Sequence, residues 1–312
     1  MKVIYTGETD TRAMKEAIVD ASKKLMTDEK CVWLEADLAG CDGIKGLMGD
    51  SDRYINCGIA ESNMIGICAG LASNGMKPYC HSFAPFVSRR TFDQAFLSAG
   101  YAHNPITVIG TDSGICAAFN GGTHMPFEDT ATYRLIPESI VCDATDYAML
   151  YNFLMMAKDL PGVKYVRTTR KAFQAFYEDD AKFEIGKGIV AREGSDCLIV
   201  AAGIMMHEAM QAAEKLSNEG IECAVIDPFT IKPLDVELIR EYASKCGKVV
   251  VAENHNKIGG LVSAVQDAIV DLGCKFGYVA IEDEYGQVGP QDFLRDEYKL
   301  TDTHIAEVVK SL

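Results

Sequence analysis

The chain has 312 residues, of which 48% are hydrophobic and 24% are charged, so it has the size and composition of a globular protein with two domains. Its net charge of −15 argues against nucleic-acid binding, because the phosphate backbone requires a basic surface. No apolar run reaches the ~20 residues that cross a bilayer, and the N-terminus lacks a secretory signal pattern, so we expect a cytoplasmic protein without membrane contact.

Strand-like and helix-like segments alternate along the first part of the chain. Apolar strands that alternate with helices are typical of a mostly parallel sheet covered on both faces, which indicates a first α/β domain over 1–171. Continuous apolar runs predict strands over 31–38, 77–83, 106–112, 139–146 and 163–169, and helical periodicity predicts helices over 61–75, 89–103 and 147–160.

A polar, glycine-containing stretch interrupts this alternation, and we place a linker over 172–190. The alternation resumes in a second, smaller domain over 191–312. The sequence therefore predicts an α/β fold of two domains, each with a mostly parallel sheet flanked by helices. In the second domain we predict strands over 197–203, 222–228, 248–254 and 276–283, and helices over 205–220, 235–247 and 260–273.

The motifs of several common enzyme classes do not occur in the sequence. There is no G-x-G-x-x-G after a strand, no P-loop, no H-E-x-x-H and no G-x-S-x-G elbow, which argues against dinucleotide binding, P-loop chemistry, zinc peptidases and α/β-hydrolases. The eleven cysteines have no C-x-x-C pairing, so we expect buried, reduced thiols and predict no metal ligand in this chain.

Three groups of residues lie at strand ends or helix starts, where open parallel sheets bind ligands. They are Glu61 at the head of a small-residue helix, Phe83 and Phe86 after a strand, and His124 in the glycine-containing loop 111–129. Each has an ordinary structural explanation by itself. A glutamate favours the helix dipole, two phenylalanines at i and i+3 favour a core, and a lone loop histidine is commonly solvated.

The order of these groups resembles a known family. The run "RYINCGIAESNMIGICAGLASNGMKPYCHSFAPFVSRR" (53–90) is similar to the pyrimidine-binding domain of transketolases and their thiamine-diphosphate relatives. The loop "NGGTHMPFEDTATYRLIP" (120–137) resembles the family's Asp-Gly-x-Thr-His segment, and "VVVAENHNKIGGL" (249–261) resembles its carboxy-terminal domain. The likeness covers essentially the whole chain.

The resemblance implies a thiamine diphosphate site. At the position of Glu61 the family has a glutamate that hydrogen-bonds a ring nitrogen of the aminopyrimidine and promotes formation of the thiazolium ylid. Phe83 and Phe86 match the aromatics that stack on the pyrimidine. Asp37 matches an aspartate near the cofactor, and Arg89 stands where many transketolases have a tyrosine.

The resemblance also implies a sugar phosphate site. His124 matches the histidine that faces the reacting carbons, and Arg12 and Arg170 match arginines that hold the phosphate. Asn120 replaces the family's aspartate and Thr111 its histidine, and a family serine falls near Cys41. Because of these departures, we expect a ketol transfer that acts on a less common ketose phosphate.

The family's diphosphate-binding domain has no counterpart in the sequence. The resemblance therefore implies the carboxy-terminal subunit of a split transketolase, which pairs with a separate N-terminal subunit that binds the diphosphate and Mg²⁺ or another divalent ion. Because family sites form across subunit contacts, we expect two copies of this chain to associate within a heterotetramer.

Several alternatives stay open from the sequence. The β-chains of 2-oxo acid dehydrogenases share this domain pair and are also split, whereas deoxyxylulose-phosphate synthases share it but are usually one chain. From other classes, a non-catalytic scaffold or regulatory subunit and a small-molecule binding module also remain. Retention of both Glu61 and His124 argues against loss of catalysis.

Overall fold

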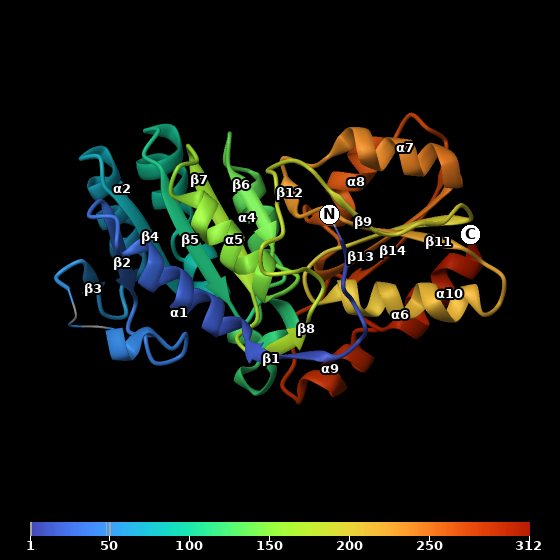
Figure 1. Ribbon diagram of the computed structural model, residues 1–312, viewed down its shortest axis with the longest axis horizontal. Helices are drawn as coiled ribbons and strands as arrows, with labels where there is room; N and C mark the ends of the chain where they lie inside the picture. Colours follow the sequence, from blue (N-terminus) through green and yellow to red (C-terminus); the bar gives the residue numbers. More distant parts are fainter. Residues whose placement is uncertain (1, 48, 50) are drawn as a thin grey trace. The chain divides into compact units, whose positions relative to one another are not determined.

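The computed structural model describes residues 2–47, 49 and 51–312 and divides into two compact units (Figure 1). The N-terminal unit comprises Lys2–Ser113 and Thr132–Phe183. The C-terminal unit comprises Gly114–Ala131 and Glu184–Leu312. The boundaries expected from the sequence, at 171 and 191, stay a prediction. Among the described residues, none of the helices has both the length and the apolar composition to span a bilayer.

The N-terminal unit is built on a parallel sheet. Six of its strands run in the order β6-β7-β5-β4-β2-β3, while β1 and β8 pair as a separate antiparallel ribbon. The strands are β1 (Thr9–Ala13), β2 (Cys31–Glu35), β3 (Tyr54–Asn56), β4 (Lys77–Phe83), β5 (Ile106–Thr111), β6 (Ile140–Asp143), β7 (Val163–Thr168) and β8 (Ala172–Gln174). The helices are α1 (Met14–Leu25), η1 (Ile44–Leu47), α2 (Glu61–Ser73), α3 (Ala84–Ser88), η2 (Gln94–Tyr101) and α5 (Tyr147–Ala157).

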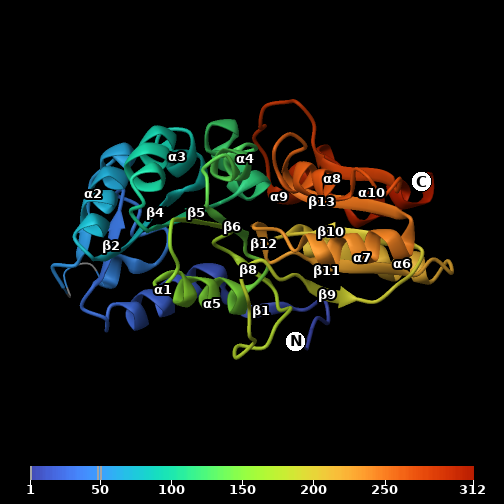
Figure 2. The ribbon, with the colours of Figure 1, turned by 90° about the horizontal axis from the view of Figure 1, so that it is seen from above.

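Helices cover both faces of this sheet. Helices α1 and α5 pack side by side on one face, and α2, α3 and η2 lie on the other (Figure 2). The core strands β2 and β5 are buried along their whole length, as their apolar sequences predict. Within the core, Trp33 stacks on Tyr79 with ring centroids 5.6 Å apart.

One predicted helix differs from the structure. The segment 89–103, expected as a single α-helix, contains the π-helix η2 instead. The wider turn is seen in the bond from Ala102 N–H to the Leu97 carbonyl, at 3.2 Å. Gly100 lies so close to Ile136 that an added Cβ would be 2.8 Å from that side chain. Close packing at a glycine therefore accompanies the wider helix here.

The strand order places a topological switch between β2 and β4. After β2 the chain goes outward to β3 on one side, and it then returns to form β4 on the other side of β2. Ligands of open α/β sheets bind outside the carboxyl ends of strands at such a point. The carboxyl ends of β2 and β4 are therefore where the fold favours a binding site.

The C-terminal unit has a five-stranded sheet in the order β14-β13-β10-β11-β9, parallel except for β9. Helices α7 and α8 lie on one face and α6 and α10 on the other (Figure 1). Both units are thus α/β with mainly parallel sheets, which confirms the predicted fold class. The strands are β9 (Ile189–Arg192), β10 (Cys197–Ala201), β11 (Cys223–Asp227), β12 (Thr230–Lys232), β13 (Lys248–Asn256) and β14 (Lys275–Ile281). The helices are η3 (Gly114–Asn120), η4 (Gly122–His124), α6 (Met205–Ser217), α7 (Val236–Cys246), α8 (Leu261–Ile269), α9 (Gln291–Glu297) and α10 (Asp302–Ser311), while α4 (Asp129–Arg134) crosses the division between the units.

Candidate active site

Glu61 is the first residue of α2, and its side chain is only 4% exposed. Ala60, which precedes it, has no side-chain group that could cap the helix, so the carboxylate is the acidic group nearest the positive end of the helix dipole. Both carboxylate oxygens accept hydrogen bonds from Nη1 of Arg90, at 3.0 and 3.1 Å. A buried carboxylate is thus held at the helix start by a partly exposed cation.

Phe83 and Phe86 form an aromatic wall beside Arg90, the partner of Glu61. Phe83 ends β4 and Phe86 lies in α3, and their ring centroids are 6.0 Å apart at an interplanar angle of 57°. The guanidinium carbon of Arg90 lies 4.1 Å from the centroid of Phe86, and that of Arg170 lies 5.0 Å from the centroid of Phe83. The structure therefore brings Phe83, Phe86 and Arg170 together, and Arg90 links them to Glu61.

Arg170 is fixed by a carboxylate at the end of β5. Its Nε and Nη2 both contact Asp112, with distances of 2.6 to 3.0 Å, and its side chain is 29% exposed. The hydrogen bonds to Asp112 raise the pKa of Arg170, so this guanidinium is a permanent cation. Asp112 follows Thr111, the last residue of β5, and has a backbone φ of 57°.

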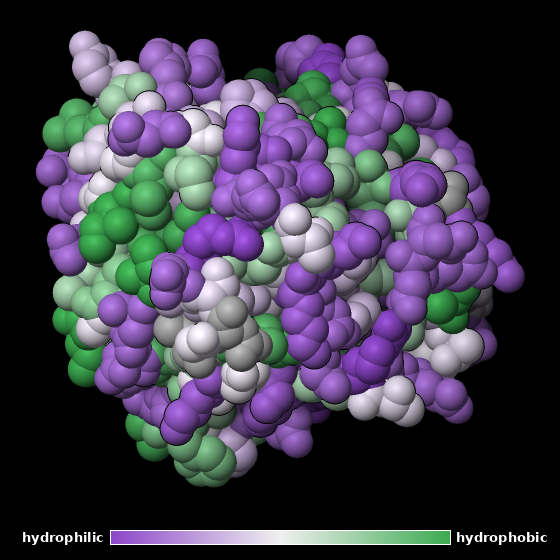
Figure 3. All heavy atoms as spheres, turned by 60° about the vertical axis from the view of Figure 1, so that its left-hand side comes forward, coloured by the Kyte–Doolittle hydropathy of each residue, from purple (hydrophilic) through white to green (hydrophobic). Residues whose placement is uncertain are grey.

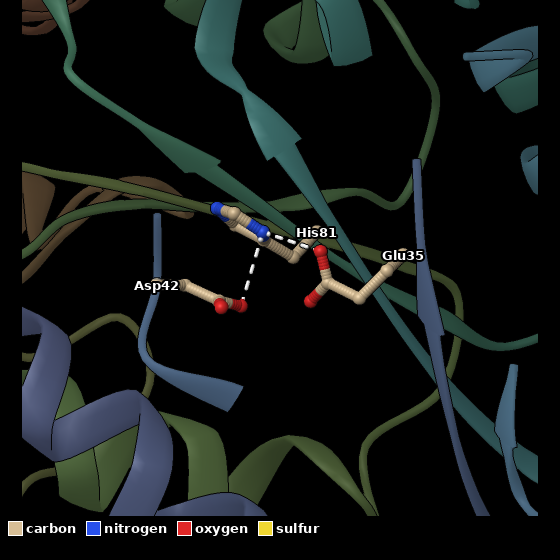
Figure 4. Close-up of side chains that lie close together, drawn as sticks. All are labelled: Glu35, Asp42 and His81. Carbon is tan, nitrogen blue, oxygen red and sulfur yellow. Dashed lines mark hydrogen bonds and ion pairs between the residues drawn. The ribbon is translucent and has the colours of Figure 1, made fainter. Parts of the chain in front are cut away.

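Thr111 is fully buried, and its hydroxyl contacts a cluster that the sequence did not predict; Figure 4 shows the members of that cluster, Glu35, Asp42 and His81. Its Oγ1 lies 2.9 Å from Nε2 of His81. Nδ1 of His81 lies 2.9 Å from Oε2 of Glu35 and 3.1 Å from Oδ2 of Asp42. Glu35, Asp42 and His81 are all completely buried. We call these three residues the carboxylate–imidazole cluster.

The sheet register creates this cluster. Glu35 and His81 are direct partners on the parallel strands β2 and β4, so their side chains lie on the same face. Burial raises the pKa of Glu35 to about 7 and that of Asp42 to about 8, and burial lowers the pKa of His81. The cluster is therefore a concentration of acidic groups in a dry environment.

The other residues of the N-terminal unit that we predicted to bind cofactor or phosphate are Asp37, Arg89 and Arg12. Asp37 follows β2 in an exposed turn with φ of 63°, and its side chain bonds Asn56 Nδ2 at 3.1 Å. Arg89 is exposed and is the C-cap residue that follows α3. Arg12 binds Asp10 and Asp179 at 2.8 Å each, and these bonds raise its pKa. An anion at Arg12 would have to displace two carboxylates.

Asn120 and His124 belong to the C-terminal unit. Asn120 ends η3 and is exposed, after a kink at Ala118 where φ is 47°. His124 ends η4, is partly exposed, and has its Nδ1 2.9 Å from Oγ1 of Thr123. The roles of both residues at a substrate stay predictions, as do those of the predicted residues in the N-terminal unit.

Sequence reasoning missed Arg90, Asp112 and the carboxylate–imidazole cluster. A signal existed for the cluster, because Glu35 and His81 are polar residues inside strands whose other residues indicate burial. A signal also existed for Arg90, which completes the pair "RR" after the two phenylalanines. The sequence could not show which arginine contacts Glu61, since 29 residues separate Arg90 from it.

Comparisons with known proteins identify the family of both domains. Residues 10–175 match the family described as transketolase, pyrimidine binding domain, and residues 186–305 match transketolase, C-terminal domain. A solved structure titled "Split gene transketolase, inactive beta4 tetramer" superposes with a TM-score of 0.86 at 32% identity, covering 96% of this chain and 97% of that one.

Individual relatives support the same assignment. The 6-deoxy-6-sulfo-D-fructose transketolase subunit SqwH of Clostridium sp. (strain MSTE9) is 39% identical over 88% of this chain and 86% of its own. A subunit of the apulose-4-phosphate transketolase of Phocaeicola vulgatus is 34% identical over 74% of this chain and 75% of its own. Human transketolase is 35% identical over 70% of this chain but only 36% of its own length. The chain belongs to the transketolase family.

Proposed function

We propose that this chain is one subunit of a two-chain transketolase, which transfers a two-carbon ketol unit from a ketose phosphate to an aldose phosphate. The observation that carries the proposal is the buried carboxylate of Glu61, which Arg90 links to the phenylalanine wall at the end of β4. A flat aminopyrimidine suits an aromatic wall, and a carboxylate can exchange a proton with a ring nitrogen, which an amide cannot. When bound, thiamine diphosphate supplies a nucleophilic carbon that carries the ketol unit.

The residues of this chain fit the aminopyrimidine half of that cofactor. Glu61 would share a hydrogen bond with the ring nitrogen and hold the proton there, while Phe83 and Phe86 would orient the ring. Arg90 now bonds both oxygens of Glu61, and we expect it to move when the cofactor binds. Asp37 and Arg89 would lie near the cofactor, as the family resemblance implies.

Substrate binding is assigned to positive and hydrogen-bonding groups. Arg170, a fixed cation beside Phe83, would bind the anionic end of the sugar, with Thr111 nearby. His124 and Asn120 would bond the sugar hydroxyls, and Arg12 would join them only by releasing its two aspartates. Two relatives are named for 6-deoxy-6-sulfofructose and apulose 4-phosphate, which supports a ketose outside the standard set.

A separate chain would supply the diphosphate and Mg²⁺ half of the site. The relatives named as subunits match this chain over most of their length, whereas human transketolase is much longer. Figure 3 shows hydrophobic surface among hydrophilic side chains on one side of the molecule. The exposed large apolar residues of the N-terminal unit include Ile59 and Tyr101, which are 76% and 79% exposed. Such residues suit an interface with a partner chain or a second copy.

The first experiment is calorimetric titration of thiamine diphosphate with Mg²⁺ into this chain alone and into a mixture with a candidate partner encoded next to it. Binding only in the mixture supports a divided site. Tight binding by this chain alone would contradict it.

The second experiment tests the chemistry with the reconstituted pair. Glu61→Gln should lower kcat by orders of magnitude, while Glu29→Gln, at an exposed glutamate, should leave it unchanged. A scaffold protein would show no turnover in either form. A ketose panel should give the highest kcat/KM with a substrate other than xylulose 5-phosphate, and consumption of pyruvate instead would indicate a dehydrogenase β-chain.

A further inference from the structure

Hydrogen bonds within the protein do not satisfy every polar atom of the carboxylate–imidazole cluster. Each of its three side chains uses one polar atom outward and one inward. The outward atoms are held by fixed partners. Oε1 of Glu35 accepts from Trp33 Nε1 at 2.9 Å, Oδ1 of Asp42 accepts from Ile44 N at 3.1 Å, and Nε2 of His81 lies 2.9 Å from Thr111 Oγ1.

The three inward atoms converge on one point (Figure 4). They are Oε2 of Glu35, Oδ2 of Asp42 and Nδ1 of His81, and all lie within 4.8 Å of one another. The imidazole has a single Nδ1–H to offer to two carboxylate oxygens. Among the described residues, Oδ2 of Asp42 accepts no hydrogen bond, although its side chain is 0% exposed. The centre of the cluster therefore holds a buried acceptor that a proton or a cation would satisfy.

The charge balance of the cluster also favours a bound cation. With both carboxyl groups ionised and the imidazole neutral, the cluster would carry a charge of −2, and burying uncompensated charge is costly. In the part of the chain that the structure describes, no lysine or arginine forms an ion pair with Glu35 or Asp42. The nearby cation, Arg170, is already paired with Asp112. A divalent cation with a neutral imidazole would bring the total charge of the cluster to zero.

We propose that Glu35, Asp42 and His81 bind a structural divalent transition-metal ion, with Zn²⁺ as the best fit to one imidazole and two carboxylates. Ligand atoms about 2.0–2.2 Å from zinc are about 3.3 Å apart at a tetrahedral angle. The distances of 2.9 and 3.1 Å from Nδ1 to the two oxygens need to lengthen by only a few tenths of an ångström. The fourth position is left for a second carboxylate oxygen or a water molecule.

The surroundings match those of known metal ligands. A ligating histidine usually engages its other ring nitrogen in a hydrogen bond, and ligating carboxylates are themselves hydrogen-bonded. Thr111, Trp33 and the Ile44 amide have these positions here. In this arrangement Nε2–H of His81 donates to Thr111, and the ion takes the place of the Nδ1 proton. The proposal rests on these residues alone and does not depend on the proposed function.

The test is titration of ZnCl₂ into the full chain after dialysis against a chelator. We expect one zinc site per chain. Zinc binding should release protons, so the measured heat should differ between two buffers of different ionisation enthalpy. Asp42→Asn and His81→Gln should each weaken binding at least tenfold, and Thr111→Val should weaken it about 10-fold. Asp143→Asn, at another buried acid, should leave zinc binding unchanged.

Eleven cysteines could also bind zinc, so the ligand type needs its own measurement. Co²⁺ in place of Zn²⁺ should give visible bands of a nitrogen and oxygen site without the near-ultraviolet absorption of cobalt thiolates. Circular dichroism of each variant checks that it is folded. Zn²⁺ should raise the thermal midpoint of the wild type but not that of the ligand variants. Binding that is equal in wild type and Asp42→Asn, or cobalt spectra of thiolate type, would overturn the proposal and leave a shared proton in the cluster.

Discussion

Replacing Arg90 should change the affinity of the site for thiamine diphosphate. Nη1 of Arg90 bonds both oxygens of Glu61, and its guanidinium stacks on Phe86 at 4.1 Å. If the ring nitrogen of the cofactor takes the place of Nη1 in front of Glu61, both contacts are broken. The variant Arg90→Met keeps a flexible, unbranched apolar side chain but removes the guanidinium and its charge.

The magnitude follows from these two contacts. Arg90 is 48% exposed, so solvent screens its ion pair with Glu61 to about 1 kcal/mol or less. A partly exposed contact between a cation and an aromatic ring contributes about 0.5–1 kcal/mol. Together they oppose cofactor binding by about 1–2 kcal/mol, which corresponds to about 5- to 30-fold in Kd. Arg90→Met should therefore bind the cofactor more tightly by that factor.

The assay is calorimetric titration of thiamine diphosphate and Mg²⁺ into the reconstituted pair. Lys23→Met, at an exposed position of α1, is the matched control and should not differ from wild type. The thermal midpoint of the cofactor-free Arg90→Met chain should fall, because Glu61 loses its partner. An unchanged or weaker affinity would show that Arg90 does not compete for Glu61.

Three further predictions concern charged residues elsewhere in the N-terminal unit. Burial lowers the pKa of Lys164 to about 7, below that of an unfolded lysine near 10.4, so the unfolded chain binds more protons between these values and stability should rise with pH across that window. Lys164→Met should raise the free energy of unfolding in urea by ~2–4 kcal/mol at pH 7 and flatten this rise, whereas the more exposed Lys158→Met should do neither. Arg170→Lys should lose the paired contact with Asp112 and raise KM for the anionic ketose about 10-fold with little change in kcat, and a fall in kcat alone would argue against an anion-binding role. Asp146 accepts hydrogen bonds from the amides of Met149, Phe176 and Tyr177 at 2.8 Å each, so Asp146→Ala should lower the free energy of unfolding by ~3 kcal/mol. Thr301→Ala removes the acceptor of a single amide and should lower it by ~1 kcal/mol. Equal losses in urea unfolding would show that the number of amides freed does not set the cost.

The fold could be predicted because its signals are local. Strands such as β2 and β10 are buried on both faces, so their sequences are continuous apolar runs that can be recognised without knowledge of their partners. The position of Glu61 and of Phe83 could be predicted for a similar reason, since a helix start and a strand end are properties of short segments. The family resemblance then supplied the chemistry.

The contacts among site residues could not be predicted, because they depend on register and on tertiary distance. Glu35 and His81 meet only because β2 and β4 pair with that particular alignment, and a shift of one residue would turn one side chain to the opposite face. Asp42 joins them from the loop after β2, and Arg90 reaches Glu61 from the end of a different helix. Spacing along the chain contains no information on either approach.

The C-terminal unit is built from two separate segments of the chain, and this limits where such a gene can be divided. Gly114–Ala131 belongs to this unit although it is encoded inside the other one. Within the unit, the Ile115 amide donates to Asn254, the Asn256 amide donates to the Phe127 carbonyl, and the Ala131 amide donates to His255, while Asn254 and His255 are buried. A cut in the linker would leave these buried groups without their partners. Separation of the two units into independent proteins would therefore need a circular rearrangement of the coding sequence or a duplicated copy of that insert.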